Sequence, residues 1–328
     1  MKISSSWLRS AVLAVALTGV SGVLASPVHA QQYPTQEIRF ICAFPAGSGA
    51  DVLVRYFAEK LRPIVGKPII VENKAGAGSL IATEFVAKSK PDGYTIYVHA
   101  ATSVALSMYL VKTVPVDVAK TIEVVATINR QPHMILVDAK SPYKTLADLT
   151  AAMKAKGDKA TYATASPIST IMGEIYKNAT GVQAVEVPYK SAPDSLNEIL
   201  SGKVDYAAHD PVFALQQQRE GRMRILAVSA GSRLAASPDL PTMNELGVPM
   251  DLTGWWAAMV PVGTPKAIKD QINKWFVEVV STEETKKFLN GFGGDPFINT
   301  PEKAQEMFLK AIGDWGAHVK AAKLQPLG

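Results

Sequence analysis

Short apolar runs alternate with amphipathic segments through the N-terminal third of the chain. Within the first amphipathic segment, Leu53, Phe57 and Leu61 recur at four-residue spacing, which places them on one face of a helix. Strand-like runs flank such segments, in the order strand 38–44, helix 50–65, strand 68–73, helix 79–89 and strand 94–100. Strict alternation of strand and helix predicts a parallel sheet covered by helices.

A long apolar stretch, 122–138, interrupts this pattern and is broken only by polar residues at 129–132. A second set of alternating helices and strands follows, at 145–156, 160–165, 169–180, 184–189, 192–202 and 204–210. Two further strands, at 224–230 and 255–262, precede a helical C-terminal part that ends near Leu324. Two α/β units joined by more than one extended crossing predict an α/β fold of two lobes with a cleft between them. The predicted lobes are 31–127 plus 229–328, and 128–228.

The first 30 residues differ from the rest of the chain. Lys2 and Arg9 precede an apolar run, 11–24, that is too short and too rich in small residues to span a bilayer. The segment ends in Val28-His29-Ala30, with small residues at the positions that signal peptidase prefers. These features predict a signal peptide over 1–30 and a periplasmic protein. A buried N-terminal helix is the alternative, and Pro27 argues against it.

Composition excludes several classes of site. The chain has 34 Lys and Arg against 29 Asp and Glu, a formal net charge of +5, and no basic run interleaved with aromatic residues, so we expect no nucleic-acid partner. The sole cysteine, Cys42, lies in an apolar strand and is predicted to be a core residue. The histidines show no metal-ligand spacing, so we expect no metal site.

Catalytic and cofactor motifs are also missing from the sequence. Gly47-Ser48-Gly49 begins like a dinucleotide-binding turn, but Val52 occupies the position of its third glycine. Ser48 does not lie in the GxSxG context of a serine hydrolase. We therefore expect no cofactor, no catalytic residues and no enzymatic activity.

Three segments share one design, in which a strand end is followed by small or hydroxyl residues and then a helix start: 46–51, 101–103 and 165–170. Ligands of open α/β sheets bind at such ends, where helix N-termini offer free N–H groups to an anion. Two or three of these bonds, each contributing roughly 1.5–3 kcal/mol, hold a carboxylate without an arginine. One such loop is equally typical of an ordinary connection, but three together favour a binding site.

Residues on these loops, and on two further strand ends, are the candidates for ligand binding. Gly47 and Gly49 allow close approach of the backbone, and Asp51 is expected to cap the helix and hold the loop. His209 is expected to donate a hydrogen bond to a ligand carboxylate, although a pair His209-Asp210 without any ligand role is an alternative. The full set of candidates is Phe44, Ala46, Gly47, Ser48, Gly49, Asp51, Thr102, Ser103, Ala165, Ser166, Ser169, Thr170, Tyr189, His209 and Asp210.

Several long motifs resemble those of a known family, in order and spacing. YPTQEIRFICAFPAGSGADVLVRYFAEKLRPIVGKPIIVENKAGAGS, KPDGYTIYV, VPYKSAPDSLNEILSGKVDY, LPTMNELG and PVGTP are similar to the Bug or TctC-type solute receptors of tripartite tricarboxylate transporters. The resemblance covers residues 33–325. It implies a two-lobed periplasmic binding protein fold, type II-like, that closes on a small organic acid. It also implies that the loops at 44–51 and 166–170 hold one ligand carboxylate.

Positions where the sequence departs from the family pattern are the ones that bear on which ligand is bound. The family's glycine-rich turn is Gly47-Ser48-Gly49 here, the second-lobe loop at 165–170 is shortened, and the usual Asp-Asn pair is replaced by His209-Asp210. Because histidine in place of an acid removes a negative charge, we hypothesise a second ligand carboxylate near His209.

The resulting prediction is a monomeric periplasmic receptor that captures a small organic carboxylate, with dicarboxylates or aromatic carboxylates favoured. Its expected partners are the membrane subunits of a tripartite tricarboxylate transporter. The alternatives are an exported α/β enzyme that acts on a small carboxylate, and a ligand sensor for a membrane signalling partner.

Overall fold

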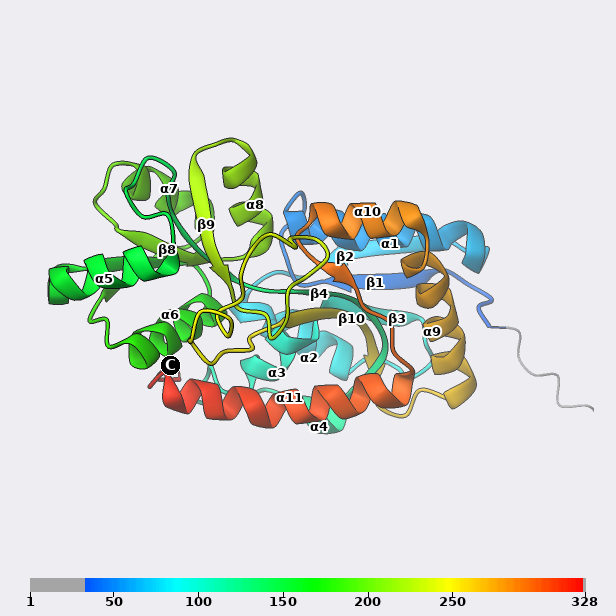
Figure 1. Cartoon of the computed structure of the whole chain (residues 1–328). Helices are drawn as coiled ribbons and strands as arrows, with labels where there is room; N and C mark the ends of the chain where they lie inside the picture. Colours follow the sequence, from blue (N-terminus) through cyan, green and yellow to red (C-terminus); the bar gives the residue numbers. More distant parts are fainter. Residues whose placement is uncertain (1–32, 327–328) are drawn as a thin grey trace, which may run out of the picture. The chain divides into compact units, whose positions relative to one another are not determined.

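The computed structural model describes residues 33–326, so the predicted signal peptide lies outside the described residues. From Pro34 onward the chain forms one compact unit. Within the described residues its strands form a six-stranded and a five-stranded sheet, each flanked by helices (Figure 1). The unit therefore has the predicted α/β fold with two lobes.

The sheet of the first lobe has the strand order β11-β4-β10-β3-β1-β2. Strand β1 pairs in parallel with β2 and β3, whereas β10 runs antiparallel between β3 and β4. The three strands predicted to form a parallel sheet, β1, β2 and β3, do pair in parallel. The sheet as a whole is mixed, because β10, which returns from the second lobe, enters antiparallel between β3 and β4. The strands are β1 (Ile38–Cys42), β2 (Ile69–Asn73), β3 (Thr95–Ala100), β4 (Ile122–Gln131), β10 (Gly254–Pro261) and β11 (Asp295–Pro296).

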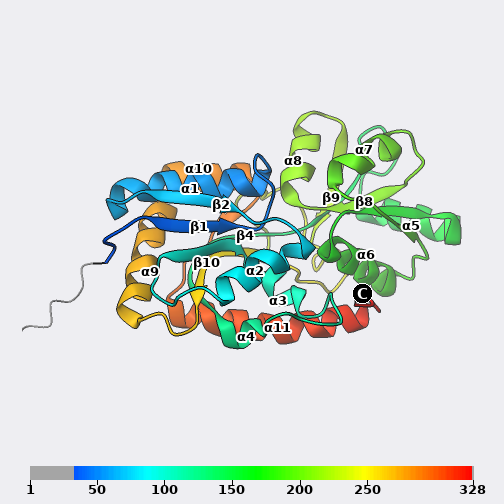
Figure 2. The same ribbon diagram turned by 180° about the vertical axis from the view of Figure 1, so that it is seen from behind.

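Helices cover both faces of this sheet. Helices α1 and α10 lie over one face, and α2, α3 and α11 over the other, as the view from behind also shows (Figure 2). The α-helices of this lobe are α1 (Gly49–Val65), α2 (Leu80–Ala87), α3 (Ala101–Ser107), α4 (Val118–Thr121), α9 (Lys266–Val280), α10 (Glu283–Gly291) and α11 (Pro301–Ala321); η1 (Ala77–Ser79) is a short 3₁₀ turn.

The predicted amphipathic face of α1 is buried. Leu53, Phe57 and Leu61 have almost no exposed surface, and the Phe57 ring stacks on Phe276 of α9 with centroids 5.7 Å apart. The helix ends at Gly66, whose φ of 67° is a left-handed conformation that glycine adopts without strain. Packing of α1 on the sheet therefore fixes where its N-terminus lies.

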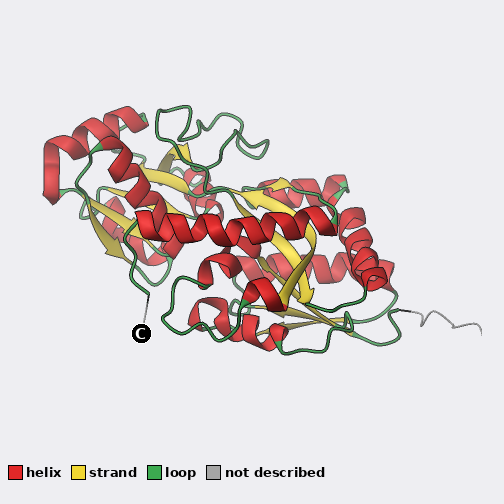
Figure 3. Cartoon of the chain, turned by 90° about the horizontal axis from the view of Figure 1, so that it is seen from below, coloured by secondary structure: helices red, strands yellow, loops and turns green. Residues whose placement is uncertain are grey.

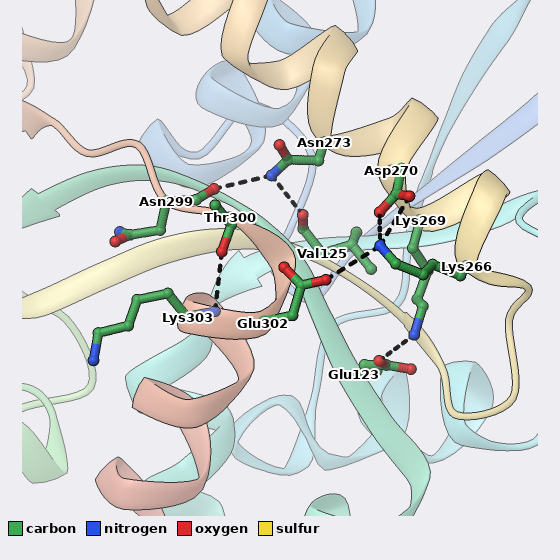
Figure 4. Close-up of polar contacts among 10 residues, drawn as sticks. All are labelled: Glu123, Val125, Lys266, Lys269, Asp270, Asn273, Asn299, Thr300, Glu302 and Lys303. Atoms are coloured by element: carbon green, nitrogen blue, oxygen red, sulfur yellow. Dashed lines mark hydrogen bonds and ion pairs between the residues drawn. The ribbon is translucent and has the colours of Figure 1, made fainter.

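Helix α9 is attached to the sheet by polar contacts as well (Figure 4). Asn273 Nδ2 donates to the carbonyl oxygens of Val125 in β4, at 2.8 Å, and of Asn299, at 3.0 Å. Lys269 forms an ion pair with Glu123 at the start of the same strand. These contacts join β4, α9 and the segment that leads into α11.

The sheet of the second lobe has the order β7-β6-β8-β5-β9 and is also mixed. Side chains of β5 alternate: Met134 and Leu136 pack toward α7 and α8, and Ile135 and Val137 toward α5 and α6. The strands are β5 (Met134–Asp138), β6 (Thr161–Thr164), β7 (Val185–Pro188), β8 (Tyr206–His209) and β9 (Met223–Val228). The helices are α5 (Leu146–Lys156), α6 (Pro167–Thr180), α7 (Ala192–Leu200) and α8 (Pro211–Arg219), with the 3₁₀ turn η2 (Gly157–Lys159).

The chain passes between the two sheets twice. The first passage is the short step from β4 to β5, and the second is the segment from the end of β9 to the start of β10, which contains neither helix nor strand. Helix α11 contacts β4 and α3 and also reaches α6 of the second lobe (Figure 3). The predicted assignment of whole residue ranges to the lobes stays a prediction.

Candidate functional site

A cavity of about 650 Å³ lies between the lobes and is lined by residues of both. Most of its walls come from loops that follow a strand and precede a helix. They contribute Phe44, Pro45, Ser48, Gly49 and Ala50; Ala100, Thr102 and Ser103; Ala165, Ser166, Ile168 and Ser169; Lys190, Ser191, Ala192 and Pro193; and His209, Asp210, Val212 and Phe213. We call this cavity the cleft.

A larger hollow, of about 770 Å³, lies on the first lobe alone, over Phe85 of α2. Its walls include residues that precede β1 and β3, such as Glu37 and Tyr94. It therefore lies at the amino ends of the strands, where helix N-termini do not point, and the cleft is the better candidate for an anion site.

Four helices of nine residues or more begin at the cleft: α1, α6, α7 and α8. The first N–H groups of each helix lack intrahelical partners and carry the positive end of the helix dipole. The N-cap side chains of Ser48, Ser166 and Asp210 each accept one of these N–H groups, from Asp51, Ser169 and Phe213. The uncapped amides, among them those of Gly49 and Ala50, remain for an anion.

Asp51 stabilises the loop between β1 and α1 through hydrogen bonds. Its carboxylate is buried and accepts from Gly47 N at 2.8 Å, from Asn73 Nδ2 at 2.7 Å and from Arg55 Nε at 2.9 Å. Burial alone would raise the pKa of Asp51, but the hydrogen bonds from these groups outweigh it and the pKa lies below its usual value. Asp51 therefore fixes the conformation of the loop and does not line the cleft.

In the loop between β6 and α6, Ser166 and Ser169 face the cleft and bond each other, with their Oγ atoms 2.9 Å apart. Thr170 bonds Glu186 of β7 instead, and so lies outside the cleft wall. Tyr189 likewise turns away, because its hydroxyl donates to Glu198 Oε2 at 2.6 Å. Its neighbours Lys190 and Ser191 line the cleft in its place.

His209 is completely buried at the end of β8, and its ring packs edge-on against Phe213. Its Nε2 lies 2.8 Å from the Oγ of Ser195, which donates its single proton to the carbonyl oxygen of Ala192 at 2.7 Å. Because that hydroxyl has no second proton, the Nε2–H of His209 is the donor in the other contact. Burial, with a smaller contribution from His133, lowers the pKa of His209 to about 3, so the imidazole is neutral.

This arrangement differs from the donor role that the sequence suggested for His209. The single N–H of the neutral ring is already used by Ser195, so none is left for a ligand carboxylate. The remaining nitrogen, Nδ1, has no hydrogen-bond partner among the described residues.

Aromatic rings form the inner walls of the cleft. Phe44 lies against Trp256 of β10, with ring centroids 6.1 Å apart, and both line the cavity. His99 lies behind them, 5.1 Å from the Phe44 ring, and burial lowers the pKa of His99 to about 3. Trp255 and Trp256 are thus both core residues and cleft walls, with only 5% and 6% of their surface exposed.

Ten of the predicted site residues line the cleft and five do not. The ten are Phe44, Ser48, Gly49, Thr102, Ser103, Ala165, Ser166, Ser169, His209 and Asp210. Ala46, Gly47, Asp51, Thr170 and Tyr189 lie next to the lining residues but outside the wall. Their contacts with ligand, like those of the ten, stay predictions.

Sequence reasoning missed several lining residues. Lys190 and Ser191 follow a strand and precede a helix, the same signal that identified the other loops, and could have been found. Gln131 and His133 lie where the chain passes between the sheets, and Phe292 follows α10, so no local pattern marks them as cleft residues.

The described residues contain no cluster of three or more His, Cys, Asp or Glu side chains that could hold a metal ion. Between residues 33 and 326, none of the helices combines the length and the apolar character needed to cross a membrane.

Comparison with known proteins decides the family. Residues 53–324 match the family described as tripartite tricarboxylate transporter family receptor, TctC. The chain belongs to this family. TctC proteins are solute-binding receptors, not enzymes, and the predicted resemblance is confirmed.

Curated and solved relatives of this TctC receptor are similar over nearly their whole lengths. Protein BugT of Bordetella pertussis is 30% identical over 308 residues, which are 92% of this chain and 94% of BugT. The solved R. palustris protein Rpa4515 with adipate is 26% identical with a TM-score of 0.80, and covers 90% of this chain and 100% of its own. The periplasmic binding protein BugD is 27% identical with a TM-score of 0.76, at the same coverage of 90% and 100%.

Proposed function

We propose that this TctC receptor binds a small organic carboxylate in the cleft, with dicarboxylates or aromatic carboxylates favoured, and passes it to the membrane subunits of a tripartite tricarboxylate transporter. The observation that carries the proposal is the convergence of four helix N-termini on one cavity with aromatic walls. The predicted signal peptide and the periplasmic binding protein BugD support a periplasmic location. We further propose that the receptor acts as a monomer.

One carboxylate is bound by backbone amides in this proposal. The amides of Gly49 and Ala50 at the start of α1 are donors within the lining set. Across the cleft, Ser166 and Ser169 bond each other, so one of their two hydroxyls keeps its proton for the ligand. Hydrogen bonds to a charged acceptor contribute roughly 1.5–3 kcal/mol each, so a few of them account for micromolar affinity. No arginine lines the cleft in the described part of the chain.

The rest of the ligand meets apolar and aromatic surface. Phe44, Trp256, Phe213 and Phe292 line the cavity, and such rings favour a hydrocarbon or aromatic body between the charged ends. Lys190 is the one cationic side chain of the wall, and it forms no ion pair within residues 33–326. A second carboxylate is therefore expected near Lys190. The relative solved with adipate, a dicarboxylate, supports this ligand class.

Calorimetry with a panel of aliphatic and aromatic mono- and dicarboxylic acids tests the ligand class. We expect at least one acid to bind while its uncharged primary amide does not, and the same acid at a hundred times its Kd to stabilise the protein by about 2.7 kcal/mol. Silence across the whole panel contradicts the proposal.

A pair of variants at Gly49 tests the role of the α1 amides. Gly49 is the first residue of the helix, a position that favours proline, and Ser48 before it is extended, as proline requires. A Cβ at Gly49 would make only ordinary contacts, 3.7 Å from Val212 and 3.9 Å from Phe292. Gly49→Ala keeps the N–H, whereas Gly49→Pro removes it. We expect Gly49→Pro to weaken binding of the acid about tenfold relative to Gly49→Ala; equal affinities would exclude this amide from the site.

A further inference from the structure

We propose that Glu186 positions the second-lobe loop 165–169 and limits how much negative charge the cleft accepts. Glu186 belongs to β7 and does not line the cleft, so it acts through the loop and is a positioning residue. The inference rests on the proposed function. It narrows the ligand class to acids whose further carboxylates lie away from this loop.

Glu186 joins the two ends of the loop. Its Oε1 accepts hydrogen bonds from the hydroxyl of Thr164, at 2.6 Å, and from that of Thr170. Thr164 is the last residue of β6, and Thr170 lies near the start of α6. Four of the five residues between the two threonines, 165, 166, 168 and 169, line the cleft. One carboxylate oxygen therefore connects the strand end and the helix start that present the loop to a ligand.

The surroundings of the two threonines give this connection weight. Both side chains are buried, and the hydroxyl of Thr164 has no other hydrogen-bond partner among the described residues. Removing the Glu186 carboxylate would leave a buried donor unpaired, which is costly. We therefore expect the loop to lose its fixed conformation when the acceptor is lost.

A comparison with the first lobe shows why the charge of Glu186 matters. Asp51 stabilises the loop between β1 and α1 in a similar way, but Arg55 neutralises it through an ion pair at 2.9 Å. On α6, Glu174 is likewise paired with Lys177. Glu186 accepts only from neutral hydroxyls, and no ion pair within residues 33–326 includes it. The second-lobe loop therefore has an uncompensated negative charge behind it.

This charge disfavours additional anionic groups at the loop. Thr170 directly follows Ser169, which lines the cleft, and charges in partly buried surroundings interact more strongly than in water. A first carboxylate at the start of α6 gains hydrogen bonds and the helix dipole, which outweigh the repulsion. A second carboxylate at the same loop would meet the repulsion alone. It therefore belongs near Lys190 in the next loop, and ligands with more charge are selected against.

Hydrogen exchange of the ligand-free protein tests the positioning role. Glu186→Gln keeps an acceptor oxygen, Glu186→Ala removes it, and Thr170→Val removes one donor with little change of shape. We expect the amides of 165–170 to exchange about tenfold faster in Glu186→Ala than in Glu186→Gln, with Thr170→Val between them. Equal exchange in Glu186→Ala and the unaltered protein would overturn the positioning role.

Calorimetry on the full mature protein tests the charge limit. The probes are succinate, adipate and phthalate, each compared with its monoamide at about pH 8, where the carboxyl groups are ionised. We expect Glu186→Gln to raise the ratio of dicarboxylate to monoamide affinity about threefold. Glu186→Ala and Thr170→Val should weaken binding of every acid, because the loop is no longer fixed. A purely structural role of Glu186 would leave the ratio in Glu186→Gln unchanged.

Asp158→Asn is the matched control. It also removes one negative charge from the second lobe, but Asp158 is exposed in η2, before β6 begins and therefore at the end of that strand away from the loop. We expect this variant to keep the affinity ratio of the unaltered protein. An equal rise in both variants would assign the effect to overall charge and overturn the role of Glu186.

The outcomes separate the two proposals. If acids bind but Glu186→Gln leaves the ratio unchanged, the charge limit is overturned and the carboxylate receptor stands. If no acid binds to the unaltered protein or to any variant, the proposed function fails and the charge limit fails with it. If Glu186→Ala does not fold, Thr170→Val decides the positioning role and Glu186→Gln the charge limit.

Discussion

At the scale of single residues, the buried histidines have the largest consequence for behaviour in solution. Burial lowers the pKa of His99 to about 3 and that of His133 to about 4. Both ring nitrogens of His99 are unpartnered among the described residues, because Phe44, Tyr97 and Trp256 surround the ring. An uncharged ring is therefore required for this packing.

We expect acid to destabilise the protein through these groups. An unfolded chain protonates histidine near pH 6.5, whereas folded His99 stays neutral down to about 3. Between these values the unfolded state binds more protons, so the free energy of unfolding falls as pH decreases, by up to about 1.4 kcal/mol per pH unit for each such histidine. Urea unfolding at a series of pH values measures the slope. In His99→Phe, the number of protons taken up on unfolding, which sets this slope, should fall by about one. An unchanged slope would contradict this.

Asp51 gives a second prediction at this scale. Asp51→Asn removes the charge that holds Arg55 and weakens the bonds from Gly47 and Asn73, so we expect a loss of about 1–3 kcal/mol in the free energy of unfolding. Because the same bonds shape the loop, affinity for acids should fall too. Thermal unfolding and calorimetry measure the two effects. Glu59→Gln, exposed on the same helix, is the control, and equal behaviour of the two variants would refute the loop role.

Local chemistry explains which site residues the sequence could predict. Ser48 and Ser166 follow strands and cap helices, and this pattern is complete within a few neighbouring residues. The tautomer of His209 depends on Ser195, 14 residues earlier, and on which group takes that serine's proton. Phe292 enters the wall only because α10 ends beside the cleft. Neither fact has a local signature.

At the scale of elements, helix α8 was not predicted, because its apolar residues, 211–215, precede its polar residues, 216–219, and do not recur at helical spacing. Only Pro211, Phe213, Ala214 and Gln217 are buried. Asp210 nevertheless caps it and Pro211 begins it, a signal that the sequence contained. The mixed pairing of the sheets was also missed, since the direction of β10 depends on the route of the chain between lobes.

The attachment of α9 gives a prediction at this scale. Asn273→Leu would leave the carbonyl oxygens of Val125 and Asn299 without their donor, so we expect a loss of about 1–3 kcal/mol in the free energy of unfolding. Chemical denaturation measures it. Lys303→Gln, with an exposed side chain nearby (Figure 4), should change stability by less than about 0.5 kcal/mol. Affinity for acids should be unaffected, since none of these residues lines the cleft; a parallel loss of affinity would contradict the separation of the two roles.

At the scale of the whole receptor unit, a hydrogen bond beside the cleft connects the two lobes. Arg219 of α8 donates through Nη2 to the carbonyl oxygen of Gly291, at the end of α10, at 3.0 Å. This bond joins the second lobe to the first next to Val212 and Phe292, which line the cleft. It therefore holds the two lobes together beside the cleft, although Arg219 does not line the cleft.

We expect Arg219→Gln to lower affinity for acids about threefold by favouring separated lobes. Calorimetry measures the affinity, and small-angle scattering without ligand should show a larger radius of gyration for the variant. Arg222→Gln is the matched control, because Arg222 pairs with Glu220 within its own lobe. If both variants bind alike, the contact does not contribute to closure.

The place of β10 in the first sheet has a consequence for how the chain folds as it is made. Its eight residues are all buried between β3 and β4, although they come more than 120 positions after β4 begins. The second sheet, by contrast, is complete once Val228 has been synthesised. The second lobe can therefore become ordered first. In the first lobe, β4 cannot join the sheet of β1, β2 and β3 until β10, which lies between β3 and β4, has been synthesised. Pulsed hydrogen exchange should find early protection in β5, β6 and β8 and late protection in β3 and β4. The predicted signal peptide implies export of the chain before it folds, and this late central strand would delay premature folding.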